Sequence, residues 1–362
     1  MARIETLQVD LLRVPLPEPM EASAAGIMTA FDMVVARITD ADGATGVGYT
    51  VLHAGQGPAV AALVDGPFRE ILLGEDAEKI EWLWRRMYKA VHYAGRGGPV
   101  TFALAAVDVA LWDLKGRRLS QPLWRLLGGH DPKVRAYAGN IDLNFPVGKL
   151  VEGGLASVEA GFRSVKMRLG RPTLAEDLSR VAAMRDALPS EIEMMADANE
   201  AWRVDQTVRA MHGLREFDLI WLEEPISPDN TAGYAHLRSL GLVPLAAGEN
   251  HHTLAEFAAL FAAGGVDFPE PDLTTCGGVT PFMKVARMAE AMGLPVMSHG
   301  AHDLHVHLLG ACPNAAYLEW HAFGLDRFMA DPLTVSEGYA TAPDRPGHGV
   351  DFDWEALLAL RV

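Results

Sequence analysis

Three apolar runs between residues 193 and 249 each lead to an acid: EMMAD (193–197), LIWLEE (219–224) and VPLAAGE (243–249). Asp197, Glu223 and Glu249 are spaced 26 residues apart, close to the length of one strand followed by one helix. In a barrel of alternating strands and helices, the carboxyl ends of the strands converge on one mouth, which carries the chemistry. The spacing therefore predicts three carboxylates at one mouth of a barrel.

Such a group of carboxylates predicts a metal site. Like charges held together repel one another unless a cation lies between them. Oxygen-only ligands suit Mg²⁺ better than Zn²⁺, which prefers nitrogen and sulfur. We therefore expect one Mg²⁺ on Asp197, Glu223 and Glu249. A plainer interpretation is that each acid stabilises the N-terminus of the following helix, but the equal spacing of all three argues against it.

The composition fits a barrel enzyme with an accessory domain. The chain has 362 residues, of which 49% are hydrophobic, so a large core is available. A formal net charge of −16 argues against a nucleic-acid partner. Cys276 and Cys312 lack the CxxC spacing of a thiolate metal site. No apolar run reaches the roughly 18 residues of a membrane span, and the N-terminus lacks a signal-peptide pattern, so we expect a cytoplasmic protein with no membrane partner.

The pattern along the chain divides it into three parts. Residues 3–52 alternate as strands around the turn DADG (40–43), and residues 57–120 follow a helical pattern, so 1–128 is predicted as an α+β capping domain. Short apolar runs then alternate with amphipathic helices from 129 to 324, which predicts an α/β barrel of about eight strands. The Pro- and Gly-rich segment 325–362 is expected to return to the capping domain. The predicted barrel strands are 134–139, 164–169, 191–197, 219–224, 243–249, 266–272, 294–300 and 316–320.

Other polar residues also lie at the ends of predicted strands. Lys166 and Arg168 are two residues apart on one strand and so point to the same side. We expect their repulsion to lower the pKa of Lys166, while Arg168 stays cationic; a solvated surface strand is the plainer interpretation. Asn199 is expected to contact the substrate or the metal ligands, or else to begin a helix. Glu224 is expected to cap the next segment.

An acid–base pair is predicted from the later strands. Of the 13 histidines, His299 is the one that closes a predicted strand, and Asp272 is placed to hold its tautomer. His305 and His307 begin a helix, so we expect them to pack in the core or lie on the surface. Glu319 ends the last strand, where a protonated carboxylic acid would donate a hydrogen bond to a developing oxyanion.

Taken together, these motifs resemble the enolase superfamily, and within it the mandelate racemase subgroup. The resemblance extends over nearly the whole chain. It rests on AAVDVALWDLKG (105–116), LLGG (126–129), KMR (166–168), DAN (197–199), WLEEP (221–225), GEN (248–250), PDLTTCGGVT (271–280) and SHG (298–300).

The resemblance implies a capping domain over a modified (β/α)₇β TIM barrel, with Mg²⁺ on the three acids. It also implies that Asp272 and His299 form a catalytic base on one face and that Glu319 hydrogen-bonds to the enolate. Members share one step, the removal of a proton α to a carboxylate, and large homo-oligomers are usual among them. The expected partner is therefore a small carboxylate substrate.

The sequence departs from the subgroup at Arg168, where many members have a second lysine that serves as the opposite base. A guanidinium with a pKa above about 12 is a poor base, so we predict one-base dehydration of an acid sugar, an aldonate or aldarate, to a 2-keto-3-deoxy acid. Racemisation, epimerisation, lactonisation and a non-catalytic sensor stay as alternatives, whereas a hydrolase lacks a GxSxG turn. Specificity is expected from capping loops that include Glu21, His53 and Tyr93.

Overall fold

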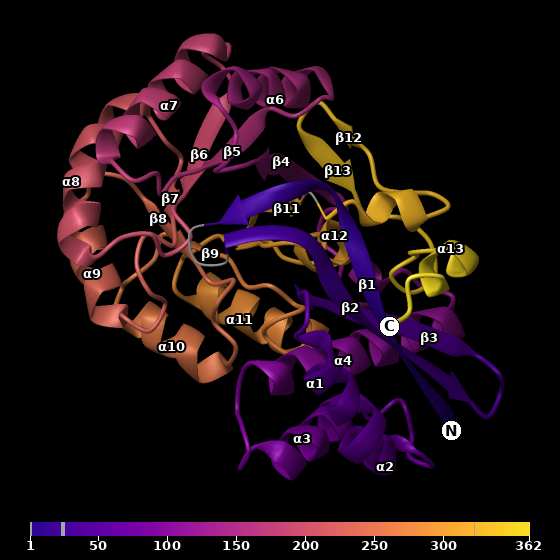
Figure 1. Ribbon diagram of the computed structural model, residues 1–362. Helices are drawn as coiled ribbons and strands as arrows, with labels where there is room; N and C mark the ends of the chain where they lie inside the picture. The colour runs from indigo at the N-terminus through magenta and orange to yellow at the C-terminus, as the bar shows by residue number, and fades with distance from the viewer. Residues whose placement is uncertain (1, 23–25, 322) are drawn as a thin grey trace.

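The computed structural model describes residues 2–22, 26–321 and 323–362. Figure 1 shows a barrel ringed by helices, beside a smaller unit built from the first part of the chain. The ends of the two longest strands, β1 and β2, reach from the smaller unit across the barrel opening. The predicted TIM-type barrel and α+β capping domain are confirmed.

The capping domain is an antiparallel sheet followed by helices. The sheet has the order β1 (Ile4–Ala22), β2 (Gly26–Asp40) and β3 (Thr45–His53), as the alternating pattern predicted. Asp40 fixes the turn between β2 and β3, because its Oδ1 accepts from the backbone N–H groups of Asp42 and Ala44, each at 3.0 Å. The helices that follow are α1 (Gly57–Leu63), η1 (Val64–Phe68), α2 (Arg69–Leu72), α3 (Ile80–Val91), α4 (Pro99–Leu119) and α5 (Leu123–Leu126).

Helix α4 joins the two domains. Gly46 and Gly48 let β3 approach it closely, since an added Cβ would come within 2.1 and 2.2 Å of carbonyl oxygens of α4. On its other side, the buried Asp108 accepts from the backbone N–H of Thr280 at 2.8 Å and from its hydroxyl at 2.7 Å. The buried position of α4 explains why its sequence is apolar on almost every face.

The barrel is a parallel sheet with the strand order β10-β11-β4-β5-β6-β7-β8-β9. Its end strands β9 and β10 are consecutive in the chain, so the sheet curls back toward its own start (Figure 1). All eight predicted strands are present. They are β4 (Lys133–Ile141), β5 (Ser164–Arg168), β6 (Glu193–Asp197), β7 (Leu222–Glu223), β8 (Leu245–Ala247), β9 (Phe268–Pro269), β10 (Val296–Ser298) and β11 (Ala315–Trp320).

Helices cover the outside of the barrel, and large side chains fill its interior. The interior cluster consists of Tyr137, Met195, Trp221, Ala246, Met297 and Tyr317, so the barrel is a packed core and not a pore. No helix in the described ranges has the length and apolar character that crossing a bilayer requires. The outer helices are α6 (Val147–Glu159), α7 (Leu174–Ala187), α8 (Val204–Leu214), η2 (Arg215–Phe217), α9 (Thr231–Ser239), α10 (Leu254–Ala262), α11 (Val279–Ala291) and α12 (His302–Leu309).

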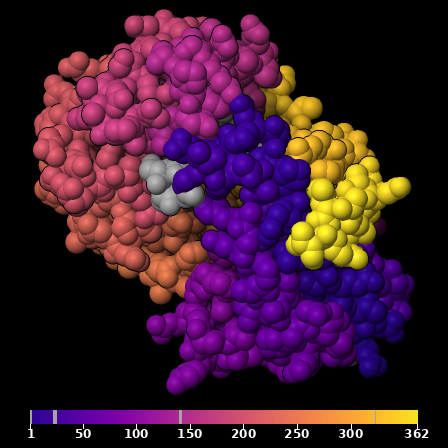
Figure 2. Space-filling view, in the orientation of Figure 1, coloured from indigo at the N-terminus to yellow at the C-terminus, as the bar shows by residue number. Residues whose placement is uncertain are grey.

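The C-terminal segment touches both domains. After η3 (Leu325–Phe328), a short hairpin of β12 (Val335–Ser336) and β13 (Tyr339–Thr341) pairs antiparallel with β4. Helix α13 (Trp354–Leu358) follows, and the carbonyl of Leu360 then accepts from the backbone N–H of Arg13 in β1 at 3.0 Å. Figure 2 shows this segment in yellow against the indigo strands. The hairpin was not predicted, because strands this short leave no alternating pattern.

Candidate active site

Neighbouring strands bring the predicted metal ligands to one edge of the barrel. Arg168 ends β5 and pairs with Asp197 at the end of β6, which pairs in turn with Glu223 at the end of β7. Glu249 follows β8 by two residues. Because the strands run parallel, all four residues lie at the same end of the barrel.

Two of these acids are held by neighbouring side chains. Asn199 donates from its backbone N–H to Asp197 Oδ1 and from Nδ2 to Oδ2, both at 2.8 Å. Trp221 Nε1 donates to Glu223 Oε2 at 2.9 Å. Asn199 adopts a left-handed backbone conformation (φ 40°) and lies before, not in, α8. Strained backbone of this kind is common where a site holds side chains in fixed directions. Asn199 is therefore better explained as a site residue than as the start of a helix.

Lys166 places a positive charge in the middle of the acids. Its Nζ lies 2.5 Å from Glu223 Oε1, 2.8 Å from Glu319 Oε1 and 3.9 Å from Asp197 Oδ2. Burial alone would lower the pKa of Lys166, but the surrounding carboxylates outweigh burial and hold the pKa well above its usual value. The expected lowering by Arg168 was wrong, because acids surround the amine while the guanidinium turns to another partner.

The partner of Arg168 is Asp142, which the sequence analysis missed. Arg168 Nη1 donates to Asp142 Oδ1 at 3.0 Å and to the carbonyl of Glu21 at 3.2 Å. Asp142 Oδ2 in turn accepts from the backbone N–H of Glu21 at 2.7 Å. These bonds tie the end of β1 to the barrel. Glu21 thus acts through its backbone, and its side chain does not line the cavity described below, contrary to the prediction.

His299 and Asp272 form the predicted pair. Asp272 Oδ2 lies 3.0 Å from His299 Nδ1, and Glu249 Oε2 lies 3.0 Å from Nε2 on the other side of the ring. The carboxylate of Asp272 is itself fixed by the backbone N–H of Thr274 at 2.6 Å. Burial lowers the pKa of His299, but Glu249, Glu319 and Asp272 outweigh it and raise the pKa well above 6.5.

Glu319 is an acceptor in this structure, not the donor that was expected. Its Oε2 accepts from the backbone N–H of Gly300 at 2.8 Å, and its Oε1 faces the ammonium of Lys166. Burial raises the pKa of Glu319, but Lys166 and His299 outweigh burial and lower the pKa below its usual range. Two cationic groups therefore face Glu319 in this structure, and its expected role as a hydrogen-bond donor to a developing oxyanion stays a prediction.

Two further buried acids were missed as site residues. Glu224 accepts from Asn250 Nδ2 at 2.6 Å in the loop after β8, instead of capping the next segment as expected. Glu270 Oε1 accepts from the hydroxyl of Tyr137 at 3.0 Å inside the barrel. Burial raises the pKa of both acids well above the usual value, which favours their neutral forms. Glu270 directly follows the short run of β9 in PEPD, and Glu224 comes one residue after Glu223 in LEE, so their positions at strand ends could have identified them.

The carboxylates at the strand ends fit a divalent cation. Burial raises the pKa of Glu223 to about 8 against the opposing charge of Lys166, with Asp197 adding to the rise. Burial also raises the pKa of Glu249. A cation between these acids would offset the cost of holding buried negative charges. Their ligand atoms are all oxygens, and the buried Oδ1 of the adjacent Asn199 has no hydrogen-bond partner in the described part of the chain, so the donor set suits Mg²⁺.

A cavity of about 830 Å³ lies over this group, between the ends of β1 and β2 and the barrel. His53, at the end of β3, lines it as predicted. Burial lowers the pKa of His53, and the charges of Arg168 and His299 lower it further. Tyr93 is 99% exposed and is not among the residues that line the cavity, so its expected role in specificity stays a prediction without support from the cavity. The apolar part of the lining includes Leu16, Met20, Met28, Phe31, Phe102 and Phe323.

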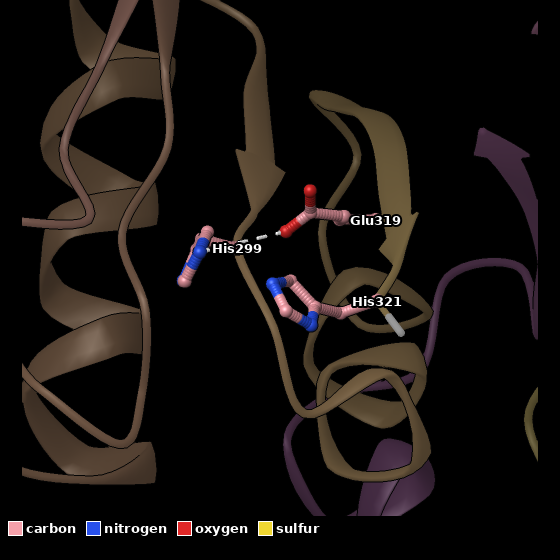
Figure 3. Close-up of side chains that lie close together, drawn as sticks. All are labelled: His299, Glu319 and His321. Carbon is pink, nitrogen blue, oxygen red and sulfur yellow. Dashed lines mark ion pairs between the residues drawn. The ribbon is translucent and has the colours of Figure 1, made fainter. Parts of the chain in front are cut away.

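His321 is a buried imidazole at the site that the sequence analysis did not single out. It follows β11, two residues after Glu319, and lines the cavity beside His299. Figure 3 shows the two imidazoles and the Glu319 carboxylate directed toward a common space. Burial lowers the pKa of His321 well below 6.5. The AYLEW run ends one residue before it, so the strand pattern gave no signal.

This arrangement defines a barrel enzyme with a capping domain, whose strand ends surround one point with acids, an amine and an imidazole. The sequence profile of the family "Enolase C-terminal domain-like" matches residues 150–356. The profile of "Mandelate racemase / muconate lactonizing enzyme, N-terminal domain" matches residues 6–128. The chain therefore belongs to the mandelate racemase and muconate lactonizing enzyme group of the enolase superfamily.

Relatives with assigned activities match almost the whole chain. A 3,6-anhydro-α-L-galactonate cycloisomerase from Streptomyces coelicolor is 48% identical over 359 residues, covering 99% of both chains. An L-talarate/galactarate dehydratase from Salmonella typhimurium is 31% identical, covering 98% of this chain and 90% of the relative. Both activities act on acid sugars.

Solved structures match as closely. A racemase from Streptomyces coelicolor with bound magnesium has a TM-score of 0.97 at 48% identity, covering 99% of this chain and 100% of the other. An L-talarate dehydratase from Polaromonas, in complex with Mg and L-glucarate, has a TM-score of 0.93 at 32% identity, covering 100% of this chain and 98% of the other.

Proposed function

We propose that this enzyme removes the proton α to the carboxylate of an acid sugar and expels the oxygen on the β-carbon, giving a 2-keto-3-deoxy acid. The observation that carries the proposal is the one-sided placement of bases. His299 is held by Asp272, whereas Arg168, in the position of the opposite base, is bound to Asp142. Because a guanidinium is a poor base, transfer of a proton between two faces is disfavoured.

Asp197, Glu223 and Glu249 would hold one Mg²⁺. Support comes from their oxygen-only donor set and from the magnesium in the related Streptomyces coelicolor structure. When bound, the ion supplies positive charge beside the substrate carboxylate, which favours the negative charge that develops as the α-proton leaves.

The chain's own residues carry the proton transfer. Lys166 presents an ammonium group to the substrate carboxylate. His299 accepts the α-proton at Nε2, and Asp272 stabilises the imidazolium through Nδ1. The electron pair of the C–H bond forms a C=C bond as the β-C–O bond breaks. The imidazolium then gives its proton to the departing oxygen, and the resulting enol tautomerises to the 2-keto acid.

The same step accounts for a lyase or an isomerase, depending on the leaving oxygen. A β-hydroxyl leaves as water, which is dehydration. In a 3,6-anhydro acid the β-oxygen is the ring ether, so it stays attached through C6 and the product is an isomer of the substrate. The 48% identity to a cycloisomerase that acts on such an acid favours the ring ether as the leaving group in this chain.

The cavity favours a substrate with a single carboxylate. Among the described residues that line it, Arg168 is the one lysine or arginine side chain, and Asp142 already neutralises that charge. The apolar part of the lining suits the compact ring of an anhydro sugar. A dicarboxylic aldarate would bring a second negative charge with no counterpart, so we propose an aldonate, open or anhydro, over an aldarate.

The test is a panel of aldonates, aldarates and 3,6-anhydrogalactonate, incubated with enzyme and Mg²⁺ in D₂O and followed by NMR and mass spectrometry. We expect a 2-keto-3-deoxy acid, formed without loss of water from the anhydro acid, and no product with His299→Asn. Incorporation of α-deuterium without any keto acid would show a racemase or epimerase instead. If acids bind but none of them exchanges its α-proton, the result would favour a protein that senses the ligand without catalysis.

A further inference from the structure

Beside the predicted magnesium ligands lies a second group with a different chemistry. His299, Glu319 and His321 each offer one ligand atom, and these atoms all lie within 4.8 Å of one another. They come from two adjacent strand ends, after β10 and along β11, and Figure 3 shows them facing one another. We propose that this group is a binding site for a nitrogen-preferring divalent cation such as Zn²⁺, and that its occupancy switches the enzyme off.

The ligand types separate this site from the magnesium site. Two imidazoles and one carboxylate match the ligands that Zn²⁺ prefers, with metal–nitrogen distances of about 2.0–2.1 Å. Mg²⁺ prefers oxygen and is bound weakly by such a set. The three donor atoms lie within 4.8 Å of one another, so coordination of one ion would need their side chains to move closer together. Glu249 Oε2, which lies 3.0 Å from His299 Nε2, or a water molecule would be the fourth ligand.

The surroundings already orient these ligands as in a zinc site. Histidine ligands usually donate their second ring N–H to a carboxylate, which fixes the ring and strengthens the ligand. Asp272 lies 3.0 Å from His299 Nδ1 and provides this arrangement. Glu319 is fixed by the backbone N–H of Gly300.

One ring nitrogen of His321 is left without a hydrogen-bond partner among the described residues. The residue is 6% exposed, and the nitrogen in question is Nδ1. Its ring stacks on Phe323 with centroids 3.8 Å apart, which holds the imidazole plane toward the cluster. A buried polar atom without a partner is costly, and coordination of a metal ion by the imidazole would offset this cost. The cavity beside both imidazoles provides a path for the ion.

Occupancy would block catalysis for a simple reason. The metal would take the lone pair on His299 Nε2 that accepts the α-proton, so binding of Zn²⁺ and proton removal exclude each other. This inhibitory effect rests on the proposed function, whereas the binding of the ion does not.

The experiment is equilibrium dialysis of the full chain against Zn²⁺ with Mg²⁺ in large excess, with activity measured in parallel. We expect one Zn²⁺ per chain, affinity lowered at least tenfold by His321→Gln, and no change with His252→Gln, a cavity histidine outside the cluster. Asp197→Asn, which removes a magnesium ligand, should also leave Zn²⁺ binding intact. Circular dichroism would check the fold of each variant, and Co²⁺ absorption of the wild type would report nitrogen ligands in a tetrahedral site.

Zn²⁺ binding that is lost with Asp197→Asn but kept with His321→Gln would overturn the proposal, since the ion would then lie in the magnesium site. Absence of a stoichiometric site in the presence of Mg²⁺ would overturn it as well. If Zn²⁺ binds as expected but does not inhibit, the site stands and the role of His299 as base fails.

Discussion

Arg168 and Asp142 form a buried ion pair that links the barrel to the end of the capping strand β1. The guanidinium Nη1 lies 3.0 Å from Asp142 Oδ1, and the same carboxylate accepts from the backbone N–H of Glu21 in β1. Both partners are at least nine-tenths buried. The pair therefore fixes an arginine that lines the cavity and holds the capping strand against the barrel at the same point.

Asp142→Asn should weaken substrate binding. A hydrogen bond to a charged group contributes about 1.5–3 kcal/mol, and about 1.4 kcal/mol corresponds to tenfold in affinity. We therefore expect KM to rise about tenfold with a smaller change in kcat, measured by steady-state kinetics. Asp344→Asn, which breaks the exposed pair with Arg125, should change neither constant. A large fall in kcat at constant KM would contradict this role.

Asp272→Asn should disable the catalytic base without unfolding the protein. The amide would favour the wrong tautomer of His299 and would not stabilise the imidazolium. We expect kcat to fall about 10²- to 10⁴-fold, the range of general acid–base catalysis. His302→Gln serves as control, because His302 stacks on Trp320 outside the cavity. Equal losses in both variants would show that the effect is structural.

Removal of the metal should abolish activity. EDTA is expected to eliminate turnover and Mg²⁺ to restore it. Because the ion binds the folded state, Mg²⁺ at 100 times Kd should raise the free energy of unfolding by about 2.7 kcal/mol, and the melting temperature should rise with it. Asp197→Asn should raise the Mg²⁺ concentration needed for half-maximal activity at least tenfold. The exposed Asp205→Asn is the matched control. Full activity in EDTA would refute the metal site.

Asp108, which lies where α4 meets the barrel, should make the free energy of unfolding depend on pH. Burial raises the pKa of Asp108 to about 7, against about 3.9 in an unfolded chain. The folded state therefore binds this proton more tightly, and the stabilisation is present below about pH 4 and lost as the pH rises through about 7. The effect is at most about 4 kcal/mol, at about 1.4 kcal/mol per pH unit. Calorimetry at pH 5 and pH 8 should show a smaller loss of melting temperature for Asp108→Asn than for the wild type.

A new cation in the cavity should broaden specificity toward aldarates. Gln56 lines the cavity in the loop before α1. Gln56→Lys should raise kcat/KM for aldarates up to about fivefold relative to aldonates, consistent with an exposed ion pair of up to about 1 kcal/mol. Gln121→Lys adds the same charge at an exposed position outside the cavity and should leave the ratio unchanged. An unchanged ratio with Gln56→Lys would mean that the distal carboxylate does not reach this wall.

The strands and the positions of the acids could be predicted because both depend on local order along the chain. Each strand of the barrel gives an apolar run, and the parallel connection repeats at a regular interval, so Asp197 and Glu223 are adjacent in the sheet. His299 could be chosen among the histidines for the same reason, as the residue that closes a strand. The hairpin of β12 and β13 gave no such signal, because its strands are too short.

The sequence by itself determined the barrel, the capping sheet and the set of strand-end groups, since these follow from periodicity and from the direction that parallel strands share. Only the tertiary structure decided what those groups do to one another. The charge on Lys166, the accepting role of Glu319 and the pairing of Arg168 with Asp142 each depend on side chains that are distant in sequence and brought together in a buried setting. In such a setting, distances of a few ångströms decide which charge prevails.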